Sequence, residues 1–311
     1  MSSNNIILIT GGTGFVGSHL VDKLLSIGET NIHVTHYGNT TGHVAEILPK
    51  TNLHSINLTD AEATSQLFNQ VQPTQIYHLA SLAGVGTSFD QVNKTLETNT
   101  QLQLSVLLAM SNNCPQAKLL TIGTALEYKP SLDSLSETAQ LGPNNPYGVS
   151  KITQEMLSLW FHQQHHLDIV LTRSFNHFGP RQALGFVVAD FSKQIAQHPK
   201  QISVGNLEPI RDMTYVADIV DAYILLMNKG VSGEVYNIGS GKGYTIKHIL
   251  DEMIRVSGNE IEIVIDVNRY RPVDVPKVVA NIDKIKKLGW QPTTPLDFAL
   301  KTTINYYQEN L

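Results

Sequence analysis

A tyrosine and a lysine stand four residues apart in the run Tyr147-Gly-Val-Ser-Lys151. On a helix, residues at this spacing lie on one face, so the phenol and the ammonium group can contact one bound molecule. A free phenol has a pKa of about 10, and a nearby cation favours the phenolate and lowers that pKa. We therefore predict that Tyr147 is a general acid or base whose pKa is lowered by Lys151.

A glycine-rich turn, Gly11-Gly-Thr-Gly-Phe-Val-Gly17, follows a short apolar run and precedes a segment with helical apolar spacing. A strand, a glycine turn and a helix in this order are typical of a dinucleotide site, in which backbone N–H groups approach a pyrophosphate. A glycine-rich turn without a ligand is the alternative. The predicted cofactor contacts in this turn are Gly11, Thr13, Gly14, Phe15, Val16 and Gly17.

Strand-like and helix-like segments alternate through the first half of the chain, which predicts a Rossmann-type α/β fold with a doubly wound parallel sheet. The predicted strands span residues 6–10, 32–36, 53–56, 75–79, 118–123 and 169–173. The predicted helices include residues 17–26, 61–70, 94–111 and 146–165. Residues 1–174, with about 210–238 returning to them, are expected to form the dinucleotide-binding domain. The alternation weakens in residues 175–209 and 239–311, which are expected to form a smaller, mixed α/β, substrate-binding domain.

The composition narrows the class of protein. The chain has 311 residues, of which 41% are hydrophobic and 16% charged, as in soluble globular proteins. A net charge of −5 without a basic run argues against nucleic acid as a partner. No apolar stretch reaches the roughly 20 residues of a membrane span, and residues 1–5 lead directly into the first strand, so we expect no membrane partner. The single cysteine, Cys114, excludes an intrachain disulfide and fits a cytoplasmic location.

With Thr124 at the end of the fifth predicted strand, these motifs resemble the extended short-chain dehydrogenase/reductases, which modify nucleotide sugars. The resemblance runs almost end to end, through His78-Leu-Ala-Ser81, Glu97-Thr-Asn99-Thr, Asn145-Pro-Tyr147 and Leu288-Gly-Trp-Gln-Pro292. The GDP-mannose branch of this family is resembled by four parts of the second half of the chain, namely residues 173–180, 185–191 and 204–208 and the pair Arg211-Asp212. Within it, Arg271-Pro-Val-Asp-Val-Pro276 is most similar to reductases of GDP-4-keto-6-deoxy-D-mannose, which form GDP-rhamnose-type sugars.

The resemblance implies NAD(P)H-dependent reduction of the 4-keto group of a nucleotide-linked 4-keto-6-deoxy hexose. Tyr147 would donate the proton, Thr124 would orient the carbonyl oxygen, and Lys151 would bind the nicotinamide ribose. Related dehydratases carry a glutamate where this chain has Leu126, which cannot abstract a proton. Glu127 follows, and in an extended segment its side chain would point the other way. The sequence therefore favours a reductase or a related ketosugar enzyme, with 4-epimerisation and a non-catalytic dinucleotide-binding regulator as alternatives.

The second predicted strand ends without the carboxylate that binds the ribose 2′-hydroxyl of NAD. We therefore expect NADP, with NAD as the alternative, and expect His36 and Asn39 to hydrogen-bond a 2′-phosphate. The other cofactor contacts that the resemblance implies are Asn57, Leu58, Leu79, Ala80, Ser81 and Asn99.

Guanidinium groups match the oxygens of a diphosphate, so Arg211 and Arg271 are expected to bind the substrate, together with Arg181, which replaces a glycine of the branch. Surface ion pairs are the alternative for each arginine. Asn176 and Ser88 are expected to contact the sugar or phosphate, and bonds within turns are their alternative.

The histidines His162, His165 and His166 have a spacing that resembles a ligand set, but no carboxylates or cysteines accompany them, and we expect no metal site. In relatives the helices that correspond to residues 94–111 and 146–165 form a dimer interface. The resemblance therefore implies a homodimer.

Overall fold

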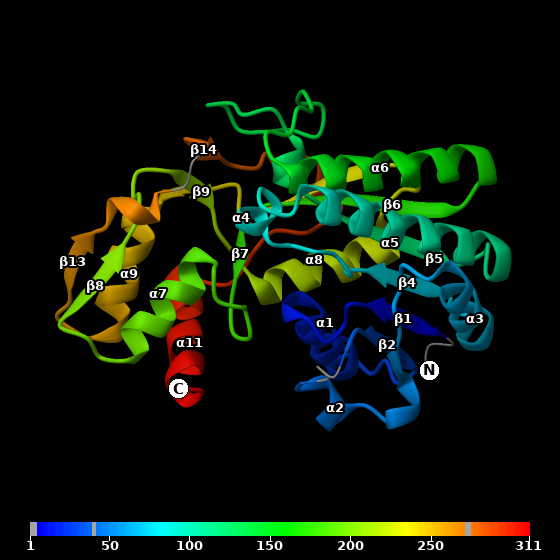
Figure 1. The fold of residues 1–311 in the computed structure, drawn as a ribbon, viewed down its shortest axis with the longest axis horizontal. Helices are drawn as coiled ribbons and strands as arrows, with labels where there is room; N and C mark the ends of the chain where they lie inside the picture. The colour runs from blue at the N-terminus through cyan, green and yellow to red at the C-terminus, as the bar shows by residue number, and fades with distance from the viewer. Residues whose placement is uncertain (1–4, 39–41, 271–274) are drawn as a thin grey trace. The chain divides into compact units, whose positions relative to one another are not determined.

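The computed structural model of the protein describes residues 5–38, 42–270 and 275–311 (Figure 1). The chain divides into two compact units. Unit 1 comprises Met1–Lys129, Gln140–Ser174 and Val220–Tyr236, and unit 2 comprises Pro130–Ala139, Phe175–Ile219 and Asn237–Leu311. Residues 130–139 and 210–219 thus lie in unit 2, whereas we expected them in the dinucleotide-binding domain.

The main sheet is built from strands β1 (Ile7–Thr10), β2 (Ile32–His36), β3 (Leu53–Ser55), β4 (Gln75–His78), β5 (Lys118–Thr124), β6 (Asp168–Ser174) and β11 (Val235–Ile238). Among the described residues it has seven strands in the order β11-β6-β5-β4-β1-β2-β3. Neighbouring strands from β6 to β3 pair in parallel. The doubly wound α/β fold predicted from the sequence is confirmed, and six of these strands match predicted ones to within a residue. Strand β11 was not predicted.

Both faces of this sheet are covered, as the fully buried residues Ile7, Leu8 and Ile9 of β1 show. Helices α3 (Ala61–Val71), α5 (Val92–Asn113) and α6 (Pro146–His165) share one hydrophobic core with β4, β5 and β6. Figure 1 shows α5 and α6 side by side along the sheet, and they pack against each other. The remaining helical elements that include unit 1 residues are α1 (Phe15–Ser26), α2 (Val44–Ile47), η1 (Lys50–Asn52), α4 (Val85–Ser88), η2 (Ala125–Glu127) and α8 (Val216–Lys229).

Helix α6 begins where the sequence predicts, because two neighbouring residues favour a helix start at this point. Pro146 occupies the first helical position, where its missing N–H is not needed. The side chain of Asn145 accepts the N–H of Gly148 at 2.8 Å and so caps the helix. These signals fix the position of Tyr147 in the first turn.

Unit 2 consists of short strands and three longer helices. Its strands are β7 (His177–Phe178), β8 (Gln201–Val204), β9 (Ile210–Asp212), β10 (Thr214–Tyr215), β12 (Gly243–Thr245), β13 (Glu262–Ile265) and β14 (Lys277–Val278). They form the small sheets β10-β7, β12-β9-β14 and β13-β8. Helices α7 (Val187–Ala196), α9 (Ile246–Ser257) and α11 (Leu296–Glu309) enclose a separate hydrophobic core, while η3 (Val267–Arg269) and α10 (Asp283–Lys286) are short.

One buried carboxylate, that of Asp212, joins three segments of unit 2. Its Oδ1 accepts the N–H and the hydroxyl of Ser240, each at 2.6 Å, and the hydroxyl of Thr214 at 3.3 Å. Its Oδ2 accepts the N–H groups of Gly241 at 2.9 Å and Ala280 at 3.2 Å. Burial raises the pKa of Asp212, and these hydrogen bonds oppose the shift. Asp212 therefore holds β9 against the loop after β11 and the segment after β14.

Within the three described ranges, no helix combines the length and the apolar character that a bilayer crossing requires.

Candidate active site

The glycine-rich turn lies between β1 and α1, at the carboxyl end of the sheet. Gly11 has φ +67°, a conformation that favours glycine, and a Cβ atom there would lie 2.9 Å from the backbone of Ala80. Gly14 precedes α1, and no side chain caps the first turn of this helix. The N–H groups at the start of α1 can therefore donate to an anion, and the turn fits the pyrophosphate of a dinucleotide.

Thr124 is the last residue of β5, and its side chain caps the short helix η2. Its Oγ1 accepts the N–H of Leu126 at 3.4 Å, while its own N–H donates to Oε1 of Glu127 at 2.7 Å. Because the oxygen of Thr124 accepts within η2, its hydroxyl proton can donate to a second acceptor. This geometry suits a hydroxyl that orients a carbonyl oxygen.

The start of α6 packs against η2. A Cβ atom at Gly148 would overlap the carbonyl oxygen of Leu126, so glycine permits this close approach. The structure thereby brings Tyr147 and Lys151 to the end of β5 that carries Thr124. The ammonium nitrogen of Lys151 lies 6.0 Å from the centre of the Tyr147 ring. It donates to the carbonyl oxygen of Ile122 at 2.8 Å, which ties α6 to β5.

The pKa of Tyr147 differs from our expectation. Burial raises the pKa of this phenol, with further contributions from Glu127 and Tyr223. The net shift is therefore opposite to the lowering that we expected from Lys151. Burial also lowers the pKa of Lys151 to about 8, against an opposing effect of Glu127. In this structure Tyr147 is therefore a proton donor that stays protonated at neutral pH.

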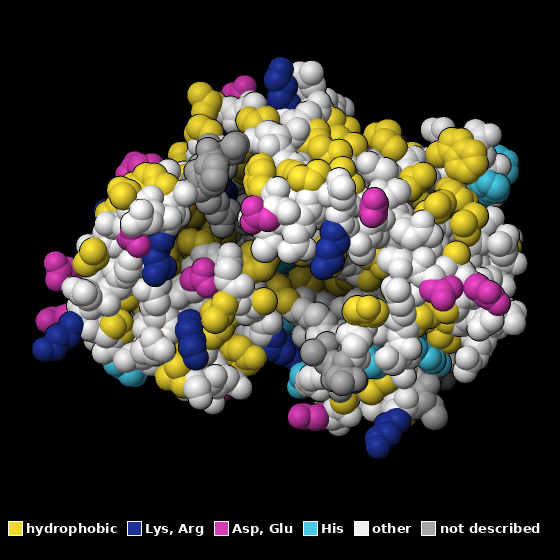
Figure 2. Space-filling view, in the orientation of Figure 1, with side chains coloured by type: hydrophobic (Ala, Val, Ile, Leu, Met, Phe, Trp, Pro, Cys, Tyr) yellow, Lys and Arg dark blue, Asp and Glu magenta, His cyan; other side chains and the backbone are white. Residues whose placement is uncertain are grey.

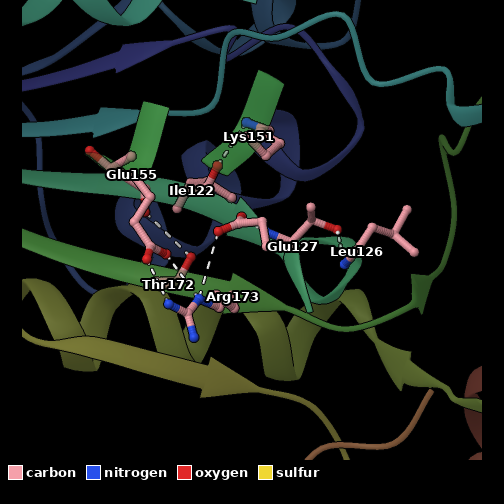
Figure 3. A network of polar contacts seen from close by, with 9 residues as sticks. Ile122, Leu126, Glu127, Lys151, Glu155, Thr172 and Arg173 are labelled. Carbon is pink, nitrogen blue, oxygen red and sulfur yellow. Dashed lines mark hydrogen bonds and ion pairs between the residues drawn. The ribbon is translucent and has the colours of Figure 1, made fainter. Parts of the chain in front are cut away.

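The local conformation at Glu127 differs from the extended segment that the sequence analysis assumed. Because residues 125–127 form a 3-10 turn, the Glu127 carboxyl group accepts the N–H of Thr124. Figure 3 shows the side chain of Glu127 pointing away from that of Leu126. The carboxyl group is completely buried, and Oε2 lies 3.6 Å from Nε of Arg173. The sequence did carry a signal, because Thr124-x-x-Glu127 is the pattern of a capping box.

Arg173 makes its main ion pair with a second glutamate, Glu155 of α6. The guanidinium group donates to both carboxyl oxygens, at 2.9 and 2.6 Å, and lies on the ring of Tyr128. Figure 3 shows Arg173 joined to both Glu155 and Glu127. Burial, followed by the neighbouring Glu155, raises the pKa of Glu127 well above its usual range.

The other predicted cofactor residues lie near the carboxyl ends of β2, β3 and β4. His36 bonds through Nδ1 to the carbonyl oxygen of Gly38 at 3.0 Å. Asn57 accepts the N–H and the hydroxyl of Thr59, so its side-chain oxygen is used within a turn. After β4, Ala80 donates its N–H to the Thr10 hydroxyl. Leu58 is buried, Leu79 and Ser81 are partly buried, and Asn39 lies outside the described residues.

Asn99 of α5 is fully buried and connects three parts of unit 1. Its Oδ1 accepts the N–H of Leu82 at 2.8 Å and the hydroxyl of Ser81 at 3.2 Å. Its amide nitrogen donates to Oγ of Ser150 at 2.9 Å. Asn99 therefore positions the segment after β4 and the first turns of α6.

The predicted substrate residues fall in both units. Ser88 of unit 1 is buried and donates its hydroxyl to the carbonyl of Val85 at 2.7 Å, within α4. In unit 2, Asn176 is exposed, and Arg211 donates to its neighbour's carbonyl at 3.0 Å. Arg181 has φ +66°, which explains why glycine suits this position in the branch. Arg271 lies outside the described residues.

No group of three or more His, Cys, Asp or Glu side chains that could hold a metal ion occurs within the part of the chain that the structure describes.

A parallel sheet with a glycine-rich first turn, together with threonine, tyrosine and lysine at the ends of β5 and α6, defines an extended short-chain dehydrogenase/reductase. A family model described as GDP-mannose 4,6 dehydratase matches residues 8–303, and the chain belongs to this family. The family is made up of NAD(P)-dependent nucleotide-sugar enzymes.

Curated relatives span several reactions. The dTDP-D-glucose 4,6-dehydratase of Homo sapiens is 28% identical over 316 residues, which cover 98% of this chain and 90% of that protein. The GDP-6-deoxy-D-mannose reductase of Pseudomonas aeruginosa is 26% identical over 315 residues, with 98% of each chain covered.

Solved structures share the fold over nearly the whole chain. The UDP-glucose 4-epimerase of Thermotoga maritima with UDP-glucose is 31% identical, has a TM-score of 0.88 and covers 98% of this chain and 99% of its own. RMD from Pseudomonas aeruginosa with NADPH is 26% identical, with a TM-score of 0.86 and coverage of 99% and 100%. The UDP-glucose 4-epimerase of Thermus thermophilus with NAD is 26% identical, with a TM-score of 0.87 and coverage of 98% and 99%.

Proposed function

We propose that this protein reduces the 4-keto group of a nucleotide-linked 4-keto-6-deoxy hexose, with GDP-4-keto-6-deoxy-D-mannose as the first substrate to test. The observation that carries the proposal is the combination of a protonated Tyr147 with the apolar Leu126. Tyr147 can give a proton to a developing alkoxide, whereas a dehydratase needs a carboxylate where this chain has Leu126.

The bound reduced nicotinamide would supply the hydride for C4. The chain's own residues would then complete the reduction. Thr124 donates its hydroxyl proton to the carbonyl oxygen and so holds it in place. Tyr147 transfers its phenolic proton to that oxygen as negative charge develops, which yields the alcohol. An alkoxide is a much stronger base than a phenolate, so a phenol with a raised pKa still transfers its proton downhill.

Unit 1 would bind the dinucleotide and unit 2 the nucleotide sugar. The glycine-rich turn and the uncapped start of α1 suit the pyrophosphate, and Lys151 suits the nicotinamide ribose. No carboxylate occurs in β2 or at Tyr37 and Gly38, which favours NADP, with His36 and Asn39 as 2′-phosphate contacts. Relatives have been solved with NADPH and with NAD, so both cofactors belong in the assay.

In unit 2, Arg181, Arg211 and Arg271 would bind the diphosphate of the substrate, and Asn176 would contact the sugar or phosphate. Ser88 is a weaker candidate for a sugar contact, because its hydroxyl proton is used within α4.

A homodimer through α5 and α6 is part of the proposal. Apolar side chains gather over these helices on the face drawn in Figure 2. Trp160 is 51% exposed and Met156 is 47% exposed, and Leu108 of α5 is also exposed. Large exposed apolar groups on adjacent helices are typical of a protein interface.

The test is incubation of the purified protein with GDP-4-keto-6-deoxy-D-mannose and NADPH or NADH, followed by identification of the product. We expect consumption of reduced cofactor and formation of a GDP-6-deoxy hexose. Tyr147→Phe should abolish turnover while leaving the fold intact. Near-normal turnover by a correctly folded Tyr147→Phe protein would refute the proposed role of Tyr147.

The second candidate is 4-epimerisation, which the 31% identity to a UDP-glucose 4-epimerase favours. Thr124, Tyr147 and Lys151 would serve that reaction as well. An epimerase keeps its dinucleotide tightly bound, so a stoichiometric dinucleotide in the purified protein would support it. An exchangeable cofactor supports the reductase, and no turnover across a panel of ketosugars would point to a non-catalytic regulator.

A further inference from the structure

Gln154 lies one helical turn beyond Lys151 on the same face of α6. Its side chain is 1% exposed, and its Oε1 accepts a hydrogen bond from the ammonium nitrogen of Lys151 at 2.8 Å. Its Nε2 donates to the backbone carbonyl of Asn99 in α5 at 2.6 Å. The amide thus bridges the lysine and a neighbouring helix.

The orientation of this amide is fixed by its two partners. An ammonium group has donors only, and a backbone carbonyl is only an acceptor. A flipped amide would place its NH2 group against Lys151 and its oxygen against the carbonyl of Asn99, and both contacts would be repulsive. The Gln154 oxygen must therefore face Lys151.

We propose that Gln154 is a positioning residue whose side-chain amide holds the Lys151 ammonium group in the direction from which it binds the dinucleotide ribose. The ammonium group has three N–H donors, and the carbonyl of Ile122 and the amide of Gln154 accept two of them. The third N–H is thereby aimed in one direction, toward a ligand hydroxyl. The inference rests on the proposed function, in which Lys151 binds the dinucleotide.

The hydrogen bonds of Gln154 also connect Lys151 to other residues that we expect to contact the cofactor. Asn99, whose carbonyl accepts from Gln154, also orders Leu82 and donates to Ser150. Ser150 in turn donates its hydroxyl to the carbonyl of Tyr147 at 2.8 Å. Gln154 therefore couples the position of Lys151 to the segment after β4 and to the first turn of α6.

The charged form of Lys151 needs such acceptors, because the side chain is only 4% exposed. The titratable groups around it are Glu127 of η2, His78 of β4 and Tyr147 of its own helix. Burial, followed by the effect of Lys151, lowers the pKa of His78 to about 3, so His78 is neutral. With Tyr147 also protonated, the carbonyl oxygens of Ile122 and Gln154 are the acceptors that bond the ammonium ion directly, and Glu127 adds an effect that favours the charged form.

Two variants of Gln154 should move the pKa of Lys151 in opposite directions. Gln154→Met removes the acceptor and lowers the pKa below about 8. Gln154→Glu places a carboxylate at the same distance and raises it, since an opposite charge favours the ammonium form. A purely architectural role for Gln154 predicts that both variants loosen the site and shift the pKa in the same direction.

The experiment measures the pKa of Lys151 by competitive acylation over a range of pH, with the modified peptide quantified by mass spectrometry. NADPH affinity is measured in parallel by fluorescence titration. For Gln154→Met we expect the Lys151 titration midpoint to fall by about one pH unit and NADPH binding at pH 8 to weaken about fivefold. Gln103→Met is the matched control, because Gln103 is a buried amide of α5 that donates to Thr121 and not to Lys151.

Equal midpoints in wild type and both Gln154 variants, or shifts of the same sign, would overturn the inference. Unchanged NADPH affinity in Gln154→Met would do so as well if the wild-type protein binds NADPH. If the wild type binds neither NADPH nor NADH, the proposed function fails instead, and the acylation midpoints still decide whether Gln154 positions Lys151.

Discussion

Oε2 of Glu127 lies 3.6 Å from Nε of Arg173, a guanidinium group that already holds both carboxyl oxygens of Glu155. All three side chains are buried, so two acids face one cation. Two ionised carboxylates at this place would leave an uncompensated buried charge, which is costly. The raised pKa of Glu127 relieves this cost, because it favours the protonated carboxyl group and leaves Arg173 to pair with Glu155.

The first prediction concerns stability. A group whose pKa is raised in the folded state stabilises the protein below its unfolded pKa and loses this contribution as the pH rises through the folded pKa. Glutamine is a neutral isostere of glutamate. The Glu127→Gln variant should therefore have nearly the wild-type free energy of unfolding at low pH, and its free energy of unfolding should not decrease at higher pH as that of the wild type does. Glu155→Gln breaks the charged pair and should cost on the order of 2–4 kcal/mol. Urea unfolding at several pH values measures both, and equal losses in the two variants would contradict this assignment of charge.

A second prediction follows from the pKa of Lys151, which burial lowers to about 8. Below this pH the ammonium group is charged and can donate to the ribose; above it the group loses its proton. Affinity for NADPH should therefore fall as the pH rises past 8, by at most about tenfold per pH unit. Lys151→Arg stays charged and should show a flat profile. A flat profile in the wild type would exclude a titrating lysine at the ribose.

Thr124→Val tests the hydroxyl at the end of β5. Valine keeps the shape of threonine and the backbone N–H that donates to Glu127, so the fold of η2 should survive. Loss of a hydrogen bond to the developing oxyanion should lower kcat by about 10²–10³-fold with little change in NADPH affinity. Thr124→Ser keeps the hydroxyl and should retain most activity. Equal activities in the Val and Ser variants would show that the hydroxyl does not contact the reacting oxygen.

The backbone conformation at Arg181 predicts that two substitutions there will weaken substrate binding equally but differ in the stability of the folded protein. Arg181→Gly and Arg181→Ala both remove the guanidinium group, so both should weaken binding of a GDP-sugar measured by calorimetry. Because the residue has φ +66°, only glycine relieves the strain, and Arg181→Gly should be more stable than Arg181→Ala by about 1 kcal/mol. Wild-type affinity in both variants would remove Arg181 from the binding site.

The exposed face of α6 predicts the assembly state. Trp160→Glu places a charge at the centre of the proposed interface and should convert the homodimer into a monomer in light scattering. Phe298→Glu of α11 is the control, because Phe298 is 59% exposed and belongs to unit 2, not to α5 or α6. A wild-type protein that is already monomeric would contradict the prediction.

The fold was predictable because its signals are local. Pro146 and Asn145 mark the start of α6, and the apolar run before Gly11 marks β1. The charge states of the site residues were harder to predict from the sequence, since they depend on burial and on partners distant in sequence. Lys151 was expected to lower the pKa of Tyr147, yet burial of the phenol, with the effects of Glu127 and Tyr223, raises it. Glu127 was expected to lie in an extended segment, but residues 125–127 form a 3-10 turn, which brings its carboxyl group to the N–H of Thr124.

Asp212 belongs to the Arg211-Asp212 pair that resembles the GDP-mannose branch, yet its carboxylate holds the fold together and bonds, among the described residues, only to other parts of unit 2. Asparagine has almost the same shape, yet its amide nitrogen would stand against one of the two sets of donors that now converge on the carboxylate. A replacement of that kind would loosen the loops next to β12 and β14 from β9, the strand that also carries Arg211. A substitution that touches no ligand could thus mimic, in an activity assay, the loss of a substrate contact.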